Sequence, residues 1–153
     1  MPTWGCMGVD KQMSEQKIEH IGGCFCGQIA YRVLGEPFGV GNCHCTNCRR
    51  FSGAAFLSAA LFERSNFTWL RGEPTKFKSS DWGDRSFCSR CGSQLIYEDN
   101  RLPDYIAINL GSLDEPNDFS PEMHIWTSSK LRWLNLNDGL TEYPKDPPME
   151  VPS

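Results

Sequence analysis

Short runs in which hydrophobic and polar residues alternate cover most of this chain, and such alternation is typical of half-buried β-strands. In residues 28–34, for example, Ile29, Tyr31 and Val33 fall on one face of an extended segment. Glycine- and proline-containing turns separate the runs. The other predicted strands cover residues 55–62, 67–70, 75–79, 85–88, 94–97, 105–110 and 123–126. This succession of short strands predicts an all-β fold, mainly antiparallel, arranged as a sandwich, a barrel or layered sheets.

The same pattern leaves little room for helices, and only residues 49–53 and 129–134 are predicted as short ones. Residues 1–19 are polar and have no clear period, which predicts an N-terminal arm. Residues 144–153 are rich in proline and predict a C-terminal tail that is either an extended edge or a loose end. A single domain at residues 20–143 is expected between the arm and the tail.

The composition is that of an ordinary globular domain. The chain has 153 residues, of which 39% are hydrophobic and 22% charged, so it resembles neither a disordered chain nor a membrane protein. No apolar run approaches the length of a membrane span, and the N-terminus carries no apolar signal-peptide core. We therefore expect a cytoplasmic protein without a membrane partner. The net charge of −4 weighs against nucleic acid as a partner.

Cysteine is the residue type that stands out, because the chain contains 8 of them. Reducing compartments keep thiols free, so clustered cysteines there indicate metal binding or catalysis rather than disulfides. Cys6 is solitary and is interpreted as an incidental thiol. The others form three clusters: Cys24-Phe25-Cys26, Cys43-His44-Cys45-Thr46-Asn47-Cys48 and Cys88-Ser89-Arg90-Cys91.

The spacing within each cluster suits a shared metal ion. Two cysteines three apart on a tight turn can bind one zinc, and two cysteines flanking one residue of a strand place both sulfurs on the same face. A structural zinc takes four protein ligands, whereas a catalytic zinc keeps three and an open position. The outer clusters would then make a closed site of four cysteines, and the middle cluster an open site of three. Other partitions remain: Cys88 or Cys91 could join the middle cluster, or His44 could complete it.

The motifs around these clusters resemble those of the glutathione-dependent formaldehyde-activating enzyme (GFA) family, which also includes centromere-protein-V-like proteins. The resemblance spans roughly residues 20–143, most of the chain. It rests on GCFCG at 23–27, CHCTNCR at 43–49, FCSRCG at 87–92, LIY at 95–97, LGSLD at 110–114, HIW at 124–126 and DG at 138–139.

This resemblance implies a fold, a cofactor and an activity. The fold would be Mss4-like, with small antiparallel sheets layered around zinc, and residues 20–143 would be a GFA-like zinc-binding domain. The founding activity is that of a carbon–sulfur lyase, in which glutathione and formaldehyde join to form S-hydroxymethylglutathione. Two zinc ions per chain are implied. A structural zinc would be held by the outer clusters, through Cys24, Cys26, Cys88 and Cys91. A second zinc would be held by Cys43, Cys45 and Cys48.

A zinc held by three thiolates carries a formal charge of +2 − 3 = −1, which weakens its effect on the acidity of bound water. A fourth sulfur is a more natural ligand for it. We therefore expect zinc-mediated formation or cleavage of a carbon–sulfur bond at Cys43, Cys45 and Cys48, with a small thiol such as glutathione, or its adduct, as the partner.

Other polar residues have weaker assignments. His44 and His124 are candidates for proton transfer, although a structural role is the favoured interpretation of each. Arg49, Arg50 and Lys130 could bind a substrate carboxylate or form surface ion pairs. The alternative function is a non-catalytic zinc module that binds protein, nucleic acid or chromatin. The acidic net charge and the three-ligand cluster favour the enzyme. A zinc store that uses the three-cysteine site is a third possibility.

Overall fold

A computed structural model of the protein describes residues 17–148, so most of the predicted N-terminal arm, Cys6 and the end of the tail lie outside it. The described residues form eleven strands, one α-helix and four 3₁₀ turns. The helix is α1 (Thr46–Ser52), and the 3₁₀ turns are η1 (Arg64–Asn66), η2 (Leu110–Ser112), η3 (Pro116–Asp118) and η4 (Thr127–Ser129). The strands are β1 (Glu19–Gly23), β2 (Ala30–Leu34), β3 (Gly39–Cys43), β4 (Leu57–Glu63), β5 (Phe67–Arg71), β6 (Thr75–Lys78), β7 (Gly83–Phe87), β8 (Gln94–Asp99), β9 (Tyr105–Asn109), β10 (Met123–Ile125) and β11 (Thr141–Glu142).

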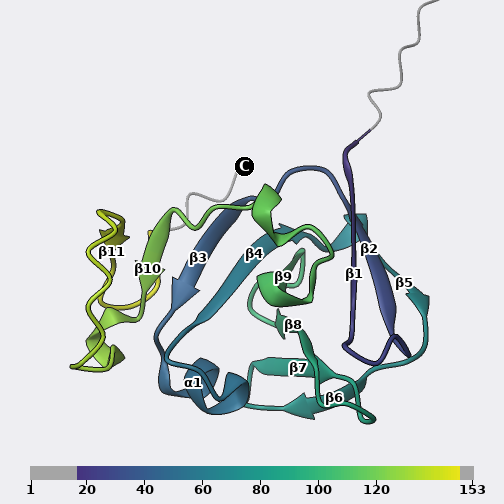
Figure 1. The fold of residues 1–153 in the computed structure, drawn as a ribbon, viewed down its shortest axis with the longest axis horizontal. Helices are drawn as coiled ribbons and strands as arrows, with labels where there is room; N and C mark the ends of the chain where they lie inside the picture. Colours follow the sequence, from purple (N-terminus) through teal and green to yellow (C-terminus); the bar gives the residue numbers. More distant parts are fainter. Residues whose placement is uncertain (1–16, 149–153) are drawn as a thin grey trace, which may run out of the picture.

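The strands make two sheets that share one hydrophobic core (Figure 1). The small sheet has the order β1-β2-β5, and the large sheet has the order β11-β10-β3-β4-β9-β8-β7-β6. Most neighbours are antiparallel, but β10 runs parallel to both β3 and β11. The predicted all-β, mainly antiparallel fold is therefore confirmed.

Strand alternation builds the core as the sequence predicts. Tyr31 and Val33 of β2 face inward with alternate residues half-buried, and Phe62 of β4 and Ile108 of β9 are likewise fully buried in the large sheet. Burying each side chain of this size contributes about 1.5–3 kcal/mol relative to leaving it in water. Tyr31 stacks on Phe67 of β5, with ring centroids 5.3 Å apart. These residues belong to one buried hydrophobic cluster to which both sheets contribute.

The secondary structure differs from the prediction in four places, one of which is the unpredicted strand β11. β1 begins at Glu19, inside the segment expected to be an arm, and β3 was not predicted because it contains two glycines. Both strands gain their stability from pairing with neighbours, which overrides weak local propensity. The helix predicted at 129–134 does not form, and only the 3₁₀ turn η4 lies at its start. The helix predicted at 49–53 is present as α1.

The beginning of the proline-rich tail is held against the residues that follow β10. The backbone N–H groups of Trp126, Thr127 and Ser128 donate to the carbonyls of Lys145, Tyr143 and Pro144. These bonds fasten the tail to the end of β10 rather than leaving it loose.

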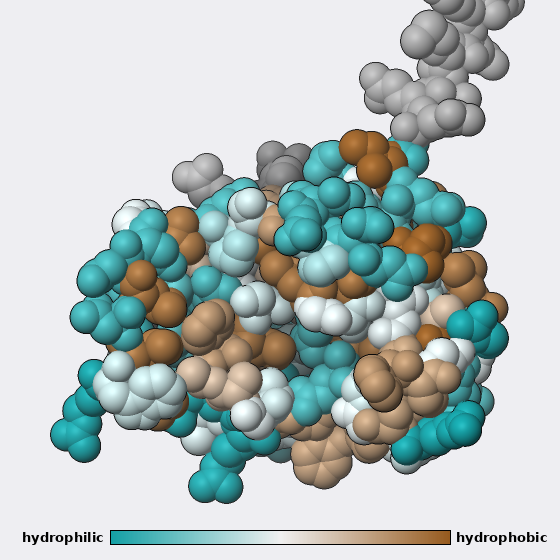
Figure 2. All heavy atoms as spheres, viewed as in Figure 1, coloured by the Kyte–Doolittle hydropathy of each residue, from teal (hydrophilic) through white to brown (hydrophobic). Residues whose placement is uncertain are grey.

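Exposed hydrophobic side chains are scattered among hydrophilic ones on the face shown in Figure 2. The most exposed are Phe25, at 94%, and Trp133, at 72%. Scattered exposed hydrophobic residues are normal for a globular surface. No helix among residues 17–148 is long and apolar enough to cross a membrane.

Gly22 of β1 has no room for a side chain. A Cβ there would overlap the ring of Tyr31 and the carbonyl of Ser112, whereas a Cβ at Gly39 of β3 would meet nothing within 4 Å. Gly22→Ala is expected to lower the free energy of unfolding by about 2 kcal/mol because the buried tyrosine must move. Gly39→Ala is the matched control and should change it by less than about 0.5 kcal/mol. Denaturant unfolding of the zinc-loaded protein measures both, and equal effects would contradict the close packing at Gly22.

Candidate metal centres

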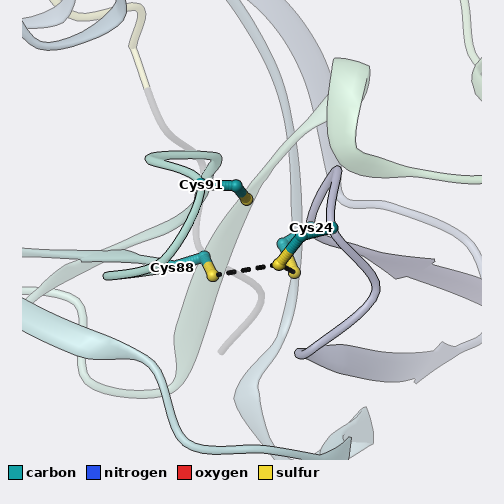
Figure 3. Close-up of side chains that lie close together, drawn as sticks. Cys24, Cys88 and Cys91 are labelled. Carbon is teal, nitrogen blue, oxygen red and sulfur yellow. Dashed lines mark hydrogen bonds between the residues drawn. The ribbon is translucent and has the colours of Figure 1, made fainter.

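The first candidate centre lies where two turns from different sheets meet. Cys24 and Cys26 lie in the turn between β1 and β2, and Cys88 and Cys91 lie in the turn between β7 and β8. Their four sulfurs are all within 4.8 Å of one another. Figure 3 shows the side chains of Cys24, Cys88 and Cys91 directed toward one another. The Cys26 sulfur lies 3.6 Å from that of Cys24 and 3.7 Å from that of Cys88. Sulfurs around a tetrahedral zinc are separated by about 3.8 Å, so this donor set fits zinc.

Each of these two turns is closed by a glycine in the left-handed conformation. Gly27 has φ 78° and donates its N–H to the carbonyl of Cys24, while Gly92 has φ 77° and donates to that of Cys88. Other residues rarely adopt such a φ, so glycine is required for the backbone to reverse directly after each cysteine pair. The motif CxxCG thus owes its glycine to backbone geometry.

Ser93 fastens the two turns to each other, a role that the sequence analysis did not identify. Its hydroxyl accepts the N–H of Phe25 at 2.8 Å and lies 3.2 Å from the sulfur of Cys91, to which it can donate. This hydrogen bond lowers the pKa of the Cys91 thiol to about 5. The thiolate is the form that binds metal, so Ser93 prepares the site as well as joining its halves.

The second candidate centre is built within one short segment. Cys43 is the last residue of β3, Cys45 caps the N-terminus of α1, and Cys48 lies in the first turn of that helix. The sulfur of Cys45 accepts the N–H of Cys48 at 3.3 Å. All three sulfurs lie within 4.8 Å of one another, and no further histidine, cysteine or carboxylate of residues 17–148 joins them. The three sulfurs fit three of the four positions of a tetrahedral zinc.

The three thiols of this segment do not share charge equally. Hydrogen bonds from Cys43 and Cys48 lower the pKa of Cys45, and the same contact with Cys45 raises the pKa of Cys43. One thiolate is therefore stabilised by two neighbouring thiols. Such an arrangement suits a cation that can replace the remaining protons.

His44 does not join the sulfurs on either side of it. Its backbone N–H donates to the carbonyl of Ile125, which continues the parallel pairing of β3 with β10. Its Nε2 lies 2.8 Å from Nδ1 of His124, and Nε2 of His124 lies 2.8 Å from Oδ2 of Asp138. Both rings are buried, and burial lowers the pKa of His44. The partition in which His44 completes the middle cluster is therefore not the one that the structure adopts.

The basic residues proposed as carboxylate binders are partly engaged elsewhere. Nε of Arg49 donates to the carbonyl of His44, and Lys130 pairs with Glu142 at 2.7 Å. Arg50 is exposed on α1.

The cation that does reach the second cluster is Arg85 of β7, whose Nη2 donates to the sulfur of Cys48 at 3.5 Å. Alternation alone predicted a strand at 85–88 but not which residue faces the cysteines.

Residues 19–129 match the model of the family described as glutathione-dependent formaldehyde-activating enzyme. The chain belongs to this family. The GFA resemblance found in the motifs is thereby confirmed, and the match covers both turns of the first centre and the whole of the second.

Individual GFA relatives are distant in sequence. A Halomonas elongata protein, named as a candidate glutathione-dependent formaldehyde-activating enzyme, is 27% identical over 75% of this chain and 79% of its own length. An uncharacterised lyase of Schizosaccharomyces pombe is 27% identical over 52% of this chain and 57% of its own length. The crystal structure of a Rhodobacter sphaeroides protein has a TM-score of 0.52 and 21% identity, covering 80% of this chain and 98% of that one. This last likeness shows a shared fold.

Removal of one sulfur from each centre should have unequal effects on folding. Cys88→Ala removes one of the four sulfurs that converge between the two sheets, and loss of a structural metal held there could unfold a small domain. We expect this substitution to lower the free energy of unfolding by about 3 kcal/mol or more, which corresponds to a fall of about 10 °C in Tm. Cys48→Ala acts within one segment and should cost about 1 kcal/mol. Thermal melts of the zinc-loaded variants test this, and the opposite ranking would reject the division of cysteines into a structural and a second site.

Ser93→Ala removes the hydroxyl that joins the two turns of the first centre. The N–H of Phe25 loses its acceptor and the sulfur of Cys91 loses its donor. We expect the protein to release zinc from this centre to a chelator about tenfold more readily, since partners of metal ligands typically affect affinity by about 10–100-fold. Ser89→Ala is the control, because Ser89 is exposed in the same turn. Equal zinc release from the two variants would contradict the role of Ser93.

Proposed function

We propose that this protein is a zinc-dependent carbon–sulfur lyase that forms or cleaves the bond between a small thiol and a carbonyl carbon. The observation that carries the proposal is the convergence of the sulfurs of Cys43, Cys45 and Cys48 with no fourth protein ligand among residues 17–148. Membership of the GFA family and the lyase named among its relatives support the same class of reaction. The family's name favours glutathione as the thiol and formaldehyde as the carbonyl compound.

The donor set favours sulfur chemistry over hydrolysis. Zinc bound to three thiolates would have a formal charge of −1, so it would activate water poorly but would supply a Lewis acid and a template for a thiol. In the forward direction the thiol sulfur bonds to the carbonyl carbon, and the carbonyl oxygen gains a proton in place of the one that the thiol loses. No electrons are exchanged with another reagent, and the reverse reaction breaks the same bond.

The residues of this chain hold the reacting segment in place. α1 fixes the spacing of Cys45 and Cys48, because Cys45 is its N-cap. The pair of His44 and His124 binds Cys43 and its neighbours to β10 from the opposite side. We propose that these histidines position the segment rather than transfer protons. The outer cluster, Cys24, Cys26, Cys88 and Cys91, is proposed to hold a structural zinc.

The direct test is zinc-edge X-ray absorption with and without a small thiol. Two centres with four and three sulfurs give an average of about 3.5 sulfurs per zinc, and binding of a thiol raises this average to about 4 at a distance of about 2.3 Å. The thiolate form binds, so the apparent affinity should rise with pH until the free thiol is itself deprotonated. Cys48→Ala is the control, because weakened zinc binding at the second centre leaves mainly the four-sulfur site, whose sulfur coordination a thiol does not raise. An unchanged average in excess thiol would reject direct ligation and favour a non-catalytic zinc module.

A further inference from the structure

Arg85 is a buried cation whose charge no carboxylate neutralises directly. The residue is 4% exposed, and no carboxylate of residues 17–148 lies within 4.0 Å of its guanidinium. A buried charge without compensation is unfavourable by several kcal/mol. Groups other than carboxylates must therefore stabilise the buried guanidinium.

The surroundings of Arg85 direct its guanidinium at the second cysteine cluster. The guanidinium carbon lies 5.2 Å from the ring centroid of Phe51, in α1, and 4.7 Å from that of Tyr97, in β8. Aromatic faces attract cations, and two of them fix the plane of the group. Nε donates to the hydroxyl of Ser79 at 3.1 Å, and Nη2 donates to the sulfur of Cys48 at 3.5 Å. The sulfur of Cys48 is the only ionisable group that the described hydrogen bonds of Arg85 reach, since the hydroxyl of Ser79 is neutral.

We propose that Arg85 is the charge-compensating residue of the second metal centre, and that it allows an anion to bind as the fourth ligand. This inference rests on the proposed function. A zinc held by three thiolates has a formal charge of −1, and an anionic fourth ligand makes this charge −2. With the fixed positive charge of Arg85 included, the formal charges at the centre sum to −1. The cation therefore makes the binding free energy of the anion more favourable. Arg85 contacts a metal ligand and is thus a positioning residue for the reaction.

The test compares an anionic with a neutral ligand in cobalt-loaded protein, in which visible absorption reports the coordination of the metal. Azide adds a negative charge to the centre and imidazole adds none. A substitution that changes the access of ligands to the metal or the packing around it affects both ligands, so the ratio of their affinities reports the electrostatic effect alone. Arg85→Met keeps the side chain between the two rings without its charge, and Arg85→Lys keeps the charge. Arg64→Met is the matched control, because Arg64 also lies over an aromatic ring, that of Phe67, and the variant loses the same net charge.

Arg85→Met is expected to weaken azide binding by about tenfold or more, as loss of a nearby charge in a partly buried site predicts. Imidazole binding should change by less than about twofold, because a neutral ligand gains little from the cation. Arg85→Lys should recover most of the azide affinity, and Arg64→Met should resemble the wild type. If Arg85→Met does not fold, Arg85→Gln replaces it, since its amide can still donate without charge.

Three results would overturn the role of Arg85. In the first, Arg85→Met weakens azide and imidazole binding equally. In the second, Arg85→Met and Arg85→Lys weaken azide binding equally. In the third, the wild-type protein does not bind azide. Wild-type protein that binds azide and imidazole but no thiol would reject the proposed function instead. The ratio of the two affinities still decides the role of Arg85 in that case.

Discussion

Two turns from different sheets meet at four cysteine sulfurs, and the position of the small sheet depends on this meeting. Cys24 and Cys26 belong to the small sheet, whereas Cys88 and Cys91 belong to the large one. Apolar packing between the sheets is not directional, so it fixes their separation better than their register. Four ligands around one metal would add a fixed geometry at one edge of the core. The hydrogen bonds of Ser93 support the same geometry from within the protein.

The second cluster obeys a different constraint, because all its ligands come from residues 43–48. Their spacing is set by the end of β3 and the start of α1, not by the closure of a long loop. Long-range contacts are needed only to orient the segment. The parallel pairing of β3 with β10 and the buried contact of His44 with His124 provide this orientation. A site made this way can exchange a ligand without separating the two sheets, which suits a centre that binds and releases substrate.

The sequence predicted those features that depend on local spacing. Most strands were found by alternation, and the division of seven cysteines into groups of four and three is the arrangement that the structure brings together, although their role as zinc ligands stays a prediction. β3 was missed because Gly39 and Gly41 weaken its local signal, and pairing with β4 and β10 stabilises it instead. A helix at 129–134 was predicted from local pattern alone, but the tail binds the backbone N–H groups of residues 126–128 directly before it, and only a 3₁₀ turn forms there.

Roles that depend on long-range contact had no local signal. Ser93 lies 68 residues from Phe25, and Arg85 lies 37 residues from Cys48. A strand pattern states that alternate residues share a face, but the partner of that face is set by topology. The parallel position of β10 beside β3 is of the same kind, since it pairs segments separated by about half of the chain. The boundaries of the domain at 20–143 and the Mss4-like name for the fold remain expectations.

The two centres also differ in how the protein meets their negative charge, and this difference matches the roles proposed for them. With zinc bound, the first would carry +2 − 4 = −2, and its described donors are neutral: the N–H of Ile29 to Cys24 and the hydroxyl of Ser93 to Cys91. Neutral donors suffice where the charge never changes. At the second centre the charge must change whenever an anionic ligand enters or leaves. A fixed cation such as Arg85 acts at longer range than a dipole, so it can stabilise a ligand that the protein does not itself contact.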